Sequence, residues 1–229
     1  MNRFAVYTAI AGGYDGLREH PEVPGVDWHA FTEEPDHGLR PDWTHHDISQ
    51  WWNGDVGLGA HPRTRAKWFK VHSSQVLPEY DRTLWIDGSV DFTAKGARFI
   101  QKVLARVATD APIMLCSHPN RHCIYEEAVA SLPMLKYEDQ PLLEQIAAYK
   151  AAGHPPGWGL WACGIIGRRN TPQLAELERR WWAEIRRWSY QDQVSLPVVL
   201  RAMQIQPTEI PVPMYSGEFF DLHMQPAAP

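Results

Sequence analysis

A carboxylate and a glycine follow a short apolar run and could bind a metal ion. Residues 84–86 predict a buried strand that ends at Asp87, and Ser89 and Asp91 follow at alternate positions. Alternate positions of an extended chain lie on one face, and Mg²⁺ is usually bound by one or two carboxylates together with substrate phosphates. We therefore predict Asp87, Ser89 and Asp91 as metal ligands. Two alternatives stay open, because Asp-Gly is also typical of a hairpin turn and Asp91 could cap the next turn.

Positive charge lies just before this acidic segment. Residues 63–76 have a helical pattern that places Arg63, Lys67 and Lys70 on one face. Such a face could neutralise a diphosphate that ends near Asp87, although basic helix faces are often simply solvated. We predict that Lys67 and Lys70 bind the phosphates of a nucleotide ligand.

A glycine turn follows the first predicted strand, Phe4 to Ile10. Ligands of open α/β sheets lie beyond the carboxyl ends of the strands, and glycine lets the backbone approach a nucleotide closely. The turn has neither the full dinucleotide glycine pattern nor the P-loop lysine. The predicted nucleoside-binding residues of this segment are Tyr7, Ala9, Gly12, Gly13, Tyr14 and Asp15.

Three further polar residues are candidates for catalysis. His118 and Arg121 lie between two cysteines, but structural zinc usually requires a second ligand pair elsewhere, so a sugar or phosphate contact is the more plausible role. Asp192 follows a long predicted helix and is either the N-cap of the last helix or a catalytic carboxylate. His223, in the C-terminal segment, could complete a metal shell because imidazole binds Mn²⁺; a surface histidine is the alternative.

The composition excludes several classes of protein. The formal charge of -5 over 229 residues argues against nonspecific nucleic-acid binding. The three cysteines form no disulfide framework, which favours a reduced compartment. No signal peptide is apparent, and no stretch approaches the roughly 20 apolar residues of a transmembrane helix. We expect a cytoplasmic protein.

Strands that alternate with helices predict a single α/β domain over residues 1–229 with a mostly parallel central sheet flanked by helices. Further strands are expected at 28–32, 113–116 and 159–167, and helices at 97–108, 125–132, 141–152 and 171–188, with a last one after Asp192. Residues 33–62 are too irregular for a long element and predict a functional loop. The proline-rich segment from about Pro207 is expected to be an extended tail.

Several segments, in order along nearly the whole chain, resemble one family. They are Tyr7–Asp15, Lys70 with Leu77-Pro78, Trp85–Ser89, His118–Arg121, Cys123–Glu127, Gly159-Leu160 and Gln191–Ser195. The chain resembles a glycosyltransferase-like domain family, formerly a domain of unknown function, that includes plant proteins named for turgor regulation and seed mucilage.

The resemblance implies a GT-A (Rossmann-like) fold in which an acidic motif holds Mn²⁺ or Mg²⁺ against the diphosphate of a nucleotide-sugar donor. Asp87 matches the first aspartate of that motif, and Ser89 stands where many relatives have a second. Lys70 matches a basic position that contacts donor phosphates, whereas Ala162 stands where many relatives have an acidic residue.

We therefore predict a metal-dependent glycosyltransferase that uses a nucleotide-diphosphate sugar, UDP-sugar first, and a carbohydrate or other hydroxyl acceptor. One branch of the family carries an amide-hydrolase label. A metal-dependent hydrolase of an amide or phosphoester, with Asp192 or Glu127 as general base, is therefore the first alternative. A noncatalytic nucleotide- or carbohydrate-binding module is the second, motivated by Ser89 and Ala162.

Overall fold

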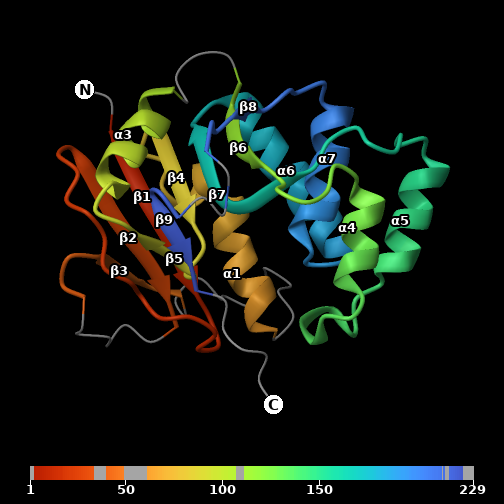
Figure 1. The fold of residues 1–229 in the computed structure, drawn as a ribbon, viewed down its shortest axis with the longest axis horizontal. Coiled ribbons are helices and arrows are strands. Elements are labelled where there is room, and N and C mark those ends of the chain that lie inside the picture. Colours follow the sequence, from red (N-terminus) through yellow and green to blue (C-terminus); the bar gives the residue numbers. More distant parts are fainter. Residues whose placement is uncertain are drawn as a thin grey trace.

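The computed structural model describes residues 3–33, 40–48, 61–106, 111–212, 214 and 217–223. Most of the loop predicted between residues 33 and 62 lies outside these ranges. Within them the dominant element is a seven-stranded sheet of order β3-β2-β1-β4-β7-β6-β8 (Figure 1). Its strands are β1 (Phe4–Ile10), β2 (Val26–Thr32), β3 (Thr44–Asp47), β4 (Arg82–Ile86), β6 (Ile113–Ser117), β7 (Trp161–Arg169) and β8 (Thr208–Glu209).

The sheet is mostly parallel, as predicted. β3, β2, β1 and β4 pair in parallel, and β6 and β8 run in the same direction. β7 alone among these strands is antiparallel to its two neighbours. Since β1 and β4 are parallel neighbours, with Tyr7 opposite Trp85, the glycine turn after β1 and the turn at Asp87 meet at one edge of the sheet.

Alternate side chains of each strand enter two separate cores. Ala5, Tyr7 and Ala9 of β1 contribute to one core and Val6 to the other, which is the two-residue periodicity of a strand that is buried on both faces. One core lies beneath α1 (Pro62–Val71), α6 (Pro172–Arg187) and α7 (Asp192–Ala202). The other lies beneath α3 (Gly96–Arg106) and a two-stranded ribbon of β5 (Val90–Phe92) and β9 (Phe220–Leu222).

The helix predicted over residues 63–76 is interrupted at His72. Both the backbone N–H and Nδ1 of His72 approach the carbonyl of Trp68, at 3.0 and 2.9 Å. The backbone of His72 leaves the helical conformation, with φ -99° and ψ 52°, so α1 ends there and α2 (Ser73–Val76) begins at the next residue. The break separates Lys70, at the end of α1, from the serines that begin α2.

The remaining helices begin and end close to the predicted positions. They include α4 (Ile124–Ser131) and α5 (Leu142–Ala151); a 3₁₀ turn that was not predicted, η2 (Leu135–Tyr137), lies between these two. The Thr171 hydroxyl accepts a hydrogen bond from the backbone N–H of Leu174 at 3.1 Å, so the predicted N-cap of α6 is confirmed. The segment after Pro207 forms β8 and β9 rather than a continuous extended tail.

No helix among the described residues is long and apolar enough to cross a membrane.

Candidate functional site

A cavity of about 220 Å³ opens at the carboxyl ends of β1 and β4. Seven residues predicted from the sequence line it: Ala9, Tyr14, Asp15, Lys67, Lys70, Asp87 and Ser89. They come from the end of β1 and the segment after it, from α1 and from the turn after β4. The fold therefore brings the glycine segment, the basic helix and the acidic turn together, which is the position expected for a ligand of an α/β sheet.

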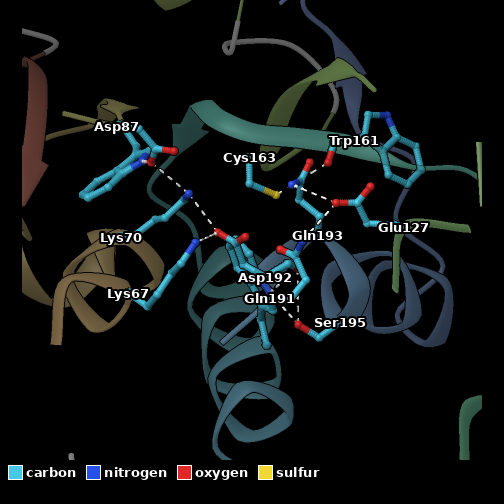
Figure 2. Close-up of polar contacts among 12 residues, drawn as sticks. Lys67, Lys70, Asp87, Glu127, Trp161, Cys163, Gln191, Asp192, Gln193 and Ser195 are labelled. Atoms are coloured by element: carbon cyan, nitrogen blue, oxygen red, sulfur yellow. Dashed lines mark hydrogen bonds and ion pairs between the residues drawn. The ribbon is translucent and has the colours of Figure 1, made fainter. Parts of the chain in front are cut away.

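Lys70 is the most deeply buried charged group of this cavity. Its side chain is 2% exposed, and its ammonium donates to Oδ1 of Asp87 at 2.9 Å and lies 2.8 Å from Oδ2 of Asp192. The Trp85 indole N–H donates to the same Asp87 oxygen at 2.7 Å. Burial acts to lower the pKa of Lys70, but the two carboxylates outweigh it and raise the pKa above its usual value. Lys70 is therefore a fixed positive charge (Figure 2).

Asp192 joins two lysines of α1 to the start of α7. Its carboxylate is 3% exposed and pairs with Lys67 as well as Lys70. Burial acts to raise the pKa of Asp192, but the two ammonium groups hold it well below the usual range. The N-cap role considered for Asp192 is wrong, because Gln191 occupies the cap position and Asp192 is the first residue of α7.

Two further cations line the cavity, Arg63 and Lys136. Arg63 lies on the predicted basic face of α1, and its guanidinium stacks on the Tyr14 ring at 4.0 Å. Lys136 lies in η2, and no local pattern marked it as a site residue. The Tyr190 hydroxyl donates to the Lys136 carbonyl, which holds η2 beside the cavity. The tertiary structure thus adds a cation that is far from α1 in the sequence.

Asp15 lies next to the turn at Asp87. A Cβ atom placed on Gly88 would be 2.7 Å from the Asp15 Cβ, so only glycine fits at this contact. Burial, together with the negative charge of Asp87, raises the pKa of Asp15 to about 6. The cavity therefore contains four cationic side chains and two carboxylates, Asp15 and Asp87.

Three residues of the predicted nucleoside-binding segment support the site from outside the cavity. The hydroxyl of Tyr7 is buried, accepts from Arg168 at 2.7 Å and donates to the Lys70 carbonyl at 3.3 Å. Gly12 and Gly13 have φ values of 68° and 65°, and a Cβ atom on Gly12 would lie 2.5 Å from Pro62. These glycines let the turn pack against the first residue of α1.

The four predicted metal ligands do not form one coordination shell. Asp91 pairs with His223 at 2.9 Å in the β5–β9 ribbon, and Arg18 lies 3.9 Å from the same carboxylate. The strand that would have placed Asp87 and Asp91 on one face ends at Ile86. Within the described ranges, no three His, Cys, Asp or Glu side chains are grouped as metal ligands. The predicted set therefore does not fit a single divalent ion.

His118 and Arg121 belong to a separate polar cluster around Glu127. Arg121 Nε donates to Glu127 at 2.6 Å, and His118 Nε2 lies 3.5 Å from the same oxygen. The side-chain amides of Gln191 and Gln193 donate to the other carboxylate oxygen at 2.9 and 3.5 Å. Figure 2 shows Glu127 and Gln193 on the side of Asp192 away from Asp87. The cluster lies beside the cavity but does not line it.

Comparison with solved structures gives glycosyltransferases at 12% sequence identity. Mouse xyloside xylosyltransferase 1 in its apo form aligns with a TM-score of 0.48, covering 91% of this chain and 83% of that chain. The apo structure of the bifunctional glycosyltransferase WbbM aligns with a TM-score of 0.50 over 88% of this chain. The alignment spans 37% of the WbbM chain, little more than a third of its length. The likeness to WbbM shows the fold, an α/β fold of the GT-A type.

A search of curated proteins by sequence gives no match. The model of the TOD1/MUCI70 glycosyltransferase-like domain matches residues 60–224. The match includes α1, the turn at Asp87, the Glu127 cluster and Asp192, and extends over more than half of the 229 residues. The chain therefore belongs to the TOD1/MUCI70 glycosyltransferase-like domain family.

Proposed function

We propose that this domain transfers a sugar from a nucleotide-diphosphate sugar, UDP-sugar first, to a hydroxyl acceptor. The observation that carries this proposal is the cavity at the carboxyl ends of β1 and β4, where Arg63, Lys67, Lys70 and Lys136 meet. A diphosphate is the ligand that four converging cations suit best. Membership of a glycosyltransferase-like family and the GT-A type of fold support the same function.

The chemical task of the cations is to stabilise the leaving group. As the bond between the sugar and the donor phosphate breaks, negative charge builds up on the departing nucleoside diphosphate. Fixed positive groups that already point at this charge lower the barrier without reorganising. Lys67 and Lys70 are held in place by Asp192, so in this proposal Asp192 is a positioning residue and does not touch the sugar.

The ion pairs of the two predicted general bases count against the hydrolase alternative. A hydrolase needs a carboxylate that is free to activate water. Both bases predicted for it are already paired, Asp192 with two lysines and Glu127 with Arg121. Each of these carboxylate side chains is 3% exposed. A water molecule beside either one would have to displace an ion pair.

The test is a thermal-shift panel of UDP-, GDP-, CMP- and ADP-sugars, followed by assays of transfer to sugar acceptors. A ligand that binds the native state alone raises the melting temperature. We expect at least one donor to raise it, and Lys67→Ala to reduce that shift.

Lys102→Ala is the matched control, because Lys102 is exposed on α3, which packs on the opposite core. The absence of a shift with every donor at millimolar concentration would overturn the proposal. Binding without transfer to any acceptor and without donor hydrolysis would favour the noncatalytic module. Release of fatty acid or phosphate without nucleotide binding would favour the hydrolase.

A further inference from the structure

The Lys70 ammonium lies between two carboxylates, one of which is the predicted metal ligand Asp87. Its ammonium lies 2.9 Å from Asp87 and 2.8 Å from Asp192. The Asp87 oxygen that it contacts also accepts the Trp85 indole N–H at 2.7 Å, so this oxygen already has two donors. The lysine thus neutralises the carboxylate that the acidic motif would offer to a metal.

Two of the other candidate ligands are engaged with each other outside the cavity. Asp91 and His223 form a pair 2.9 Å apart on the β5–β9 ribbon. The Arg18 guanidinium donates to the Gly88 carbonyl at 3.1 Å and lies 3.9 Å from Asp91. A cationic side chain therefore lies beside each of the two motif carboxylates, Lys70 at Asp87 and Arg18 at Asp91. A divalent ion at either carboxylate would lie near a positive side chain, and this repulsion disfavours its binding.

We infer that this site binds the donor diphosphate through its own side-chain cations and without a divalent metal ion. In this arrangement the Lys70 ammonium is the counter-charge of the Asp87 and Asp192 carboxylates. The inference rests on the proposed nucleotide-sugar chemistry. Arg63, Lys67 and Lys136 line the same cavity and supply further positive charge for the phosphates. Amino and guanidinium groups bind phosphate oxygens through charge-assisted hydrogen bonds, so they supply the charge that a metal provides in other enzymes.

The first experiment measures UDP binding with and without metal. The protein is dialysed against EDTA, its metal content is measured, and UDP binding is followed by calorimetry and thermal shift in EDTA, in Mn²⁺ and in Mg²⁺. We expect the same dissociation constant within about twofold in all three, and no shift from Mn²⁺ alone. Binding that appears only with metal, or a shift from Mn²⁺ alone that Asp87→Asn removes, would overturn the inference.

The second experiment measures UDP binding to one conservative variant. Asp87→Asn keeps an oxygen that can accept from Lys70 and Trp85 but removes a negative charge from the cavity wall. With side-chain cations as the phosphate ligands, UDP binds this variant as tightly as wild type or more tightly. With a metal ligand at Asp87, UDP binding would instead weaken by at least tenfold.

Lys136→Ala tests the cations directly. Lys136 is an exposed residue of η2, so its removal leaves the buried ion pairs of Lys70 intact. We expect UDP to bind about tenfold more weakly, since the variant loses a charge-assisted hydrogen bond to the phosphates. Unchanged UDP affinity of this variant would count against the inference. Failure of every nucleoside diphosphate to bind wild type, with or without metal, would instead overturn the proposed function.

Discussion

The ammonium of Lys70 lies 2.8 Å from the carboxylate of Asp192, and both side chains are almost fully buried. Lys70 belongs to the last turn of α1, and Asp192 is the first residue of α7. The ion pair therefore fixes the two helices to each other beside the cavity. It also couples the stability of the fold to the geometry of the proposed phosphate site.

Lys70→Met is expected to destabilise the protein by at most about 3–5 kcal/mol, because the buried carboxylate of Asp192 keeps Lys67 as its one remaining counter-charge. Adding Asp192→Leu removes this under-compensated carboxylate, so the double variant should lose less than the sum of the single losses. The free energy of unfolding of wild type, both single variants and the double variant measures the coupling, which we expect at 0.5–3 kcal/mol. Additive losses would show that the pair is not coupled.

Arg168→Met should remove a hydrogen bond that supports the last turn of α1. The Arg168 guanidinium donates to the Lys70 carbonyl at 2.6 Å and lies 3.9 Å from Glu178, which accepts from the Ser73 hydroxyl at 2.6 Å. Removing the guanidinium leaves Glu178 buried without a counter-charge, and we expect a loss of about 3–5 kcal/mol in chemical denaturation.

Arg180→Gln is the control for this prediction. Arg180 pairs with Glu176 on the exposed face of α6, at 2.6 Å. Exposed ion pairs contribute little to stability, so the denaturation midpoint should stay at the wild-type value. Equal effects of Arg168→Met and Arg180→Gln would contradict the assigned role of the buried pair.

Gly88→Ala should displace Asp15 from the cavity wall. The added Cβ would lie 2.7 Å from the Asp15 Cβ, and such overpacking costs about 1–3 kcal/mol. Donor binding, measured by thermal shift, should weaken at the same time. Gly16→Ala is the matched control, since nothing lies within 4 Å of its added Cβ. If the donor raises the melting temperature of both variants as much as that of wild type, the prediction is wrong.

Acid should destabilise the protein below about pH 6.5 through its buried histidines. Burial is the largest cause that lowers the pKa of His72 to about 4, and it acts in the same direction on His29 and His154. Between pH 6.5 and 4 the unfolded chain binds protons that the folded chain does not, so the free energy of unfolding falls as pH falls. Each histidine contributes about 1.4 kcal/mol per unit of pKa difference.

The measurement is chemical denaturation at several pH values between 7 and 4.5. His72→Gln removes one of the titrating groups and should flatten the decrease in the free energy of unfolding. His122→Gln, at an exposed position, should keep the wild-type slope. A His72→Gln variant with the same slope as wild type would show that His72 does not contribute.

Local patterns were sufficient for most of the fold. The apolar run Phe4–Ile10 forms β1 with the predicted bounds, and Thr171 caps α6 as its residue type indicates. These features depend on neighbours in the sequence, and local chemistry decides them. The break at His72 was missed because it depends on a side chain that contacts the carbonyl one turn earlier. Helical periodicity does not report such a contact.

The sequence by itself determined which groups could meet a diphosphate. Lys67 and Lys70 share a helix face. Asp87 follows a buried strand, and the parallel pairing of β1 and β4 brings it to the glycine segment. Only the tertiary structure decided how their charges are balanced. Asp192 and Lys136 come from distant segments, and no local pattern reports which charges become neighbours after folding. Burial then makes these pairings strong, because few water molecules remain to screen them.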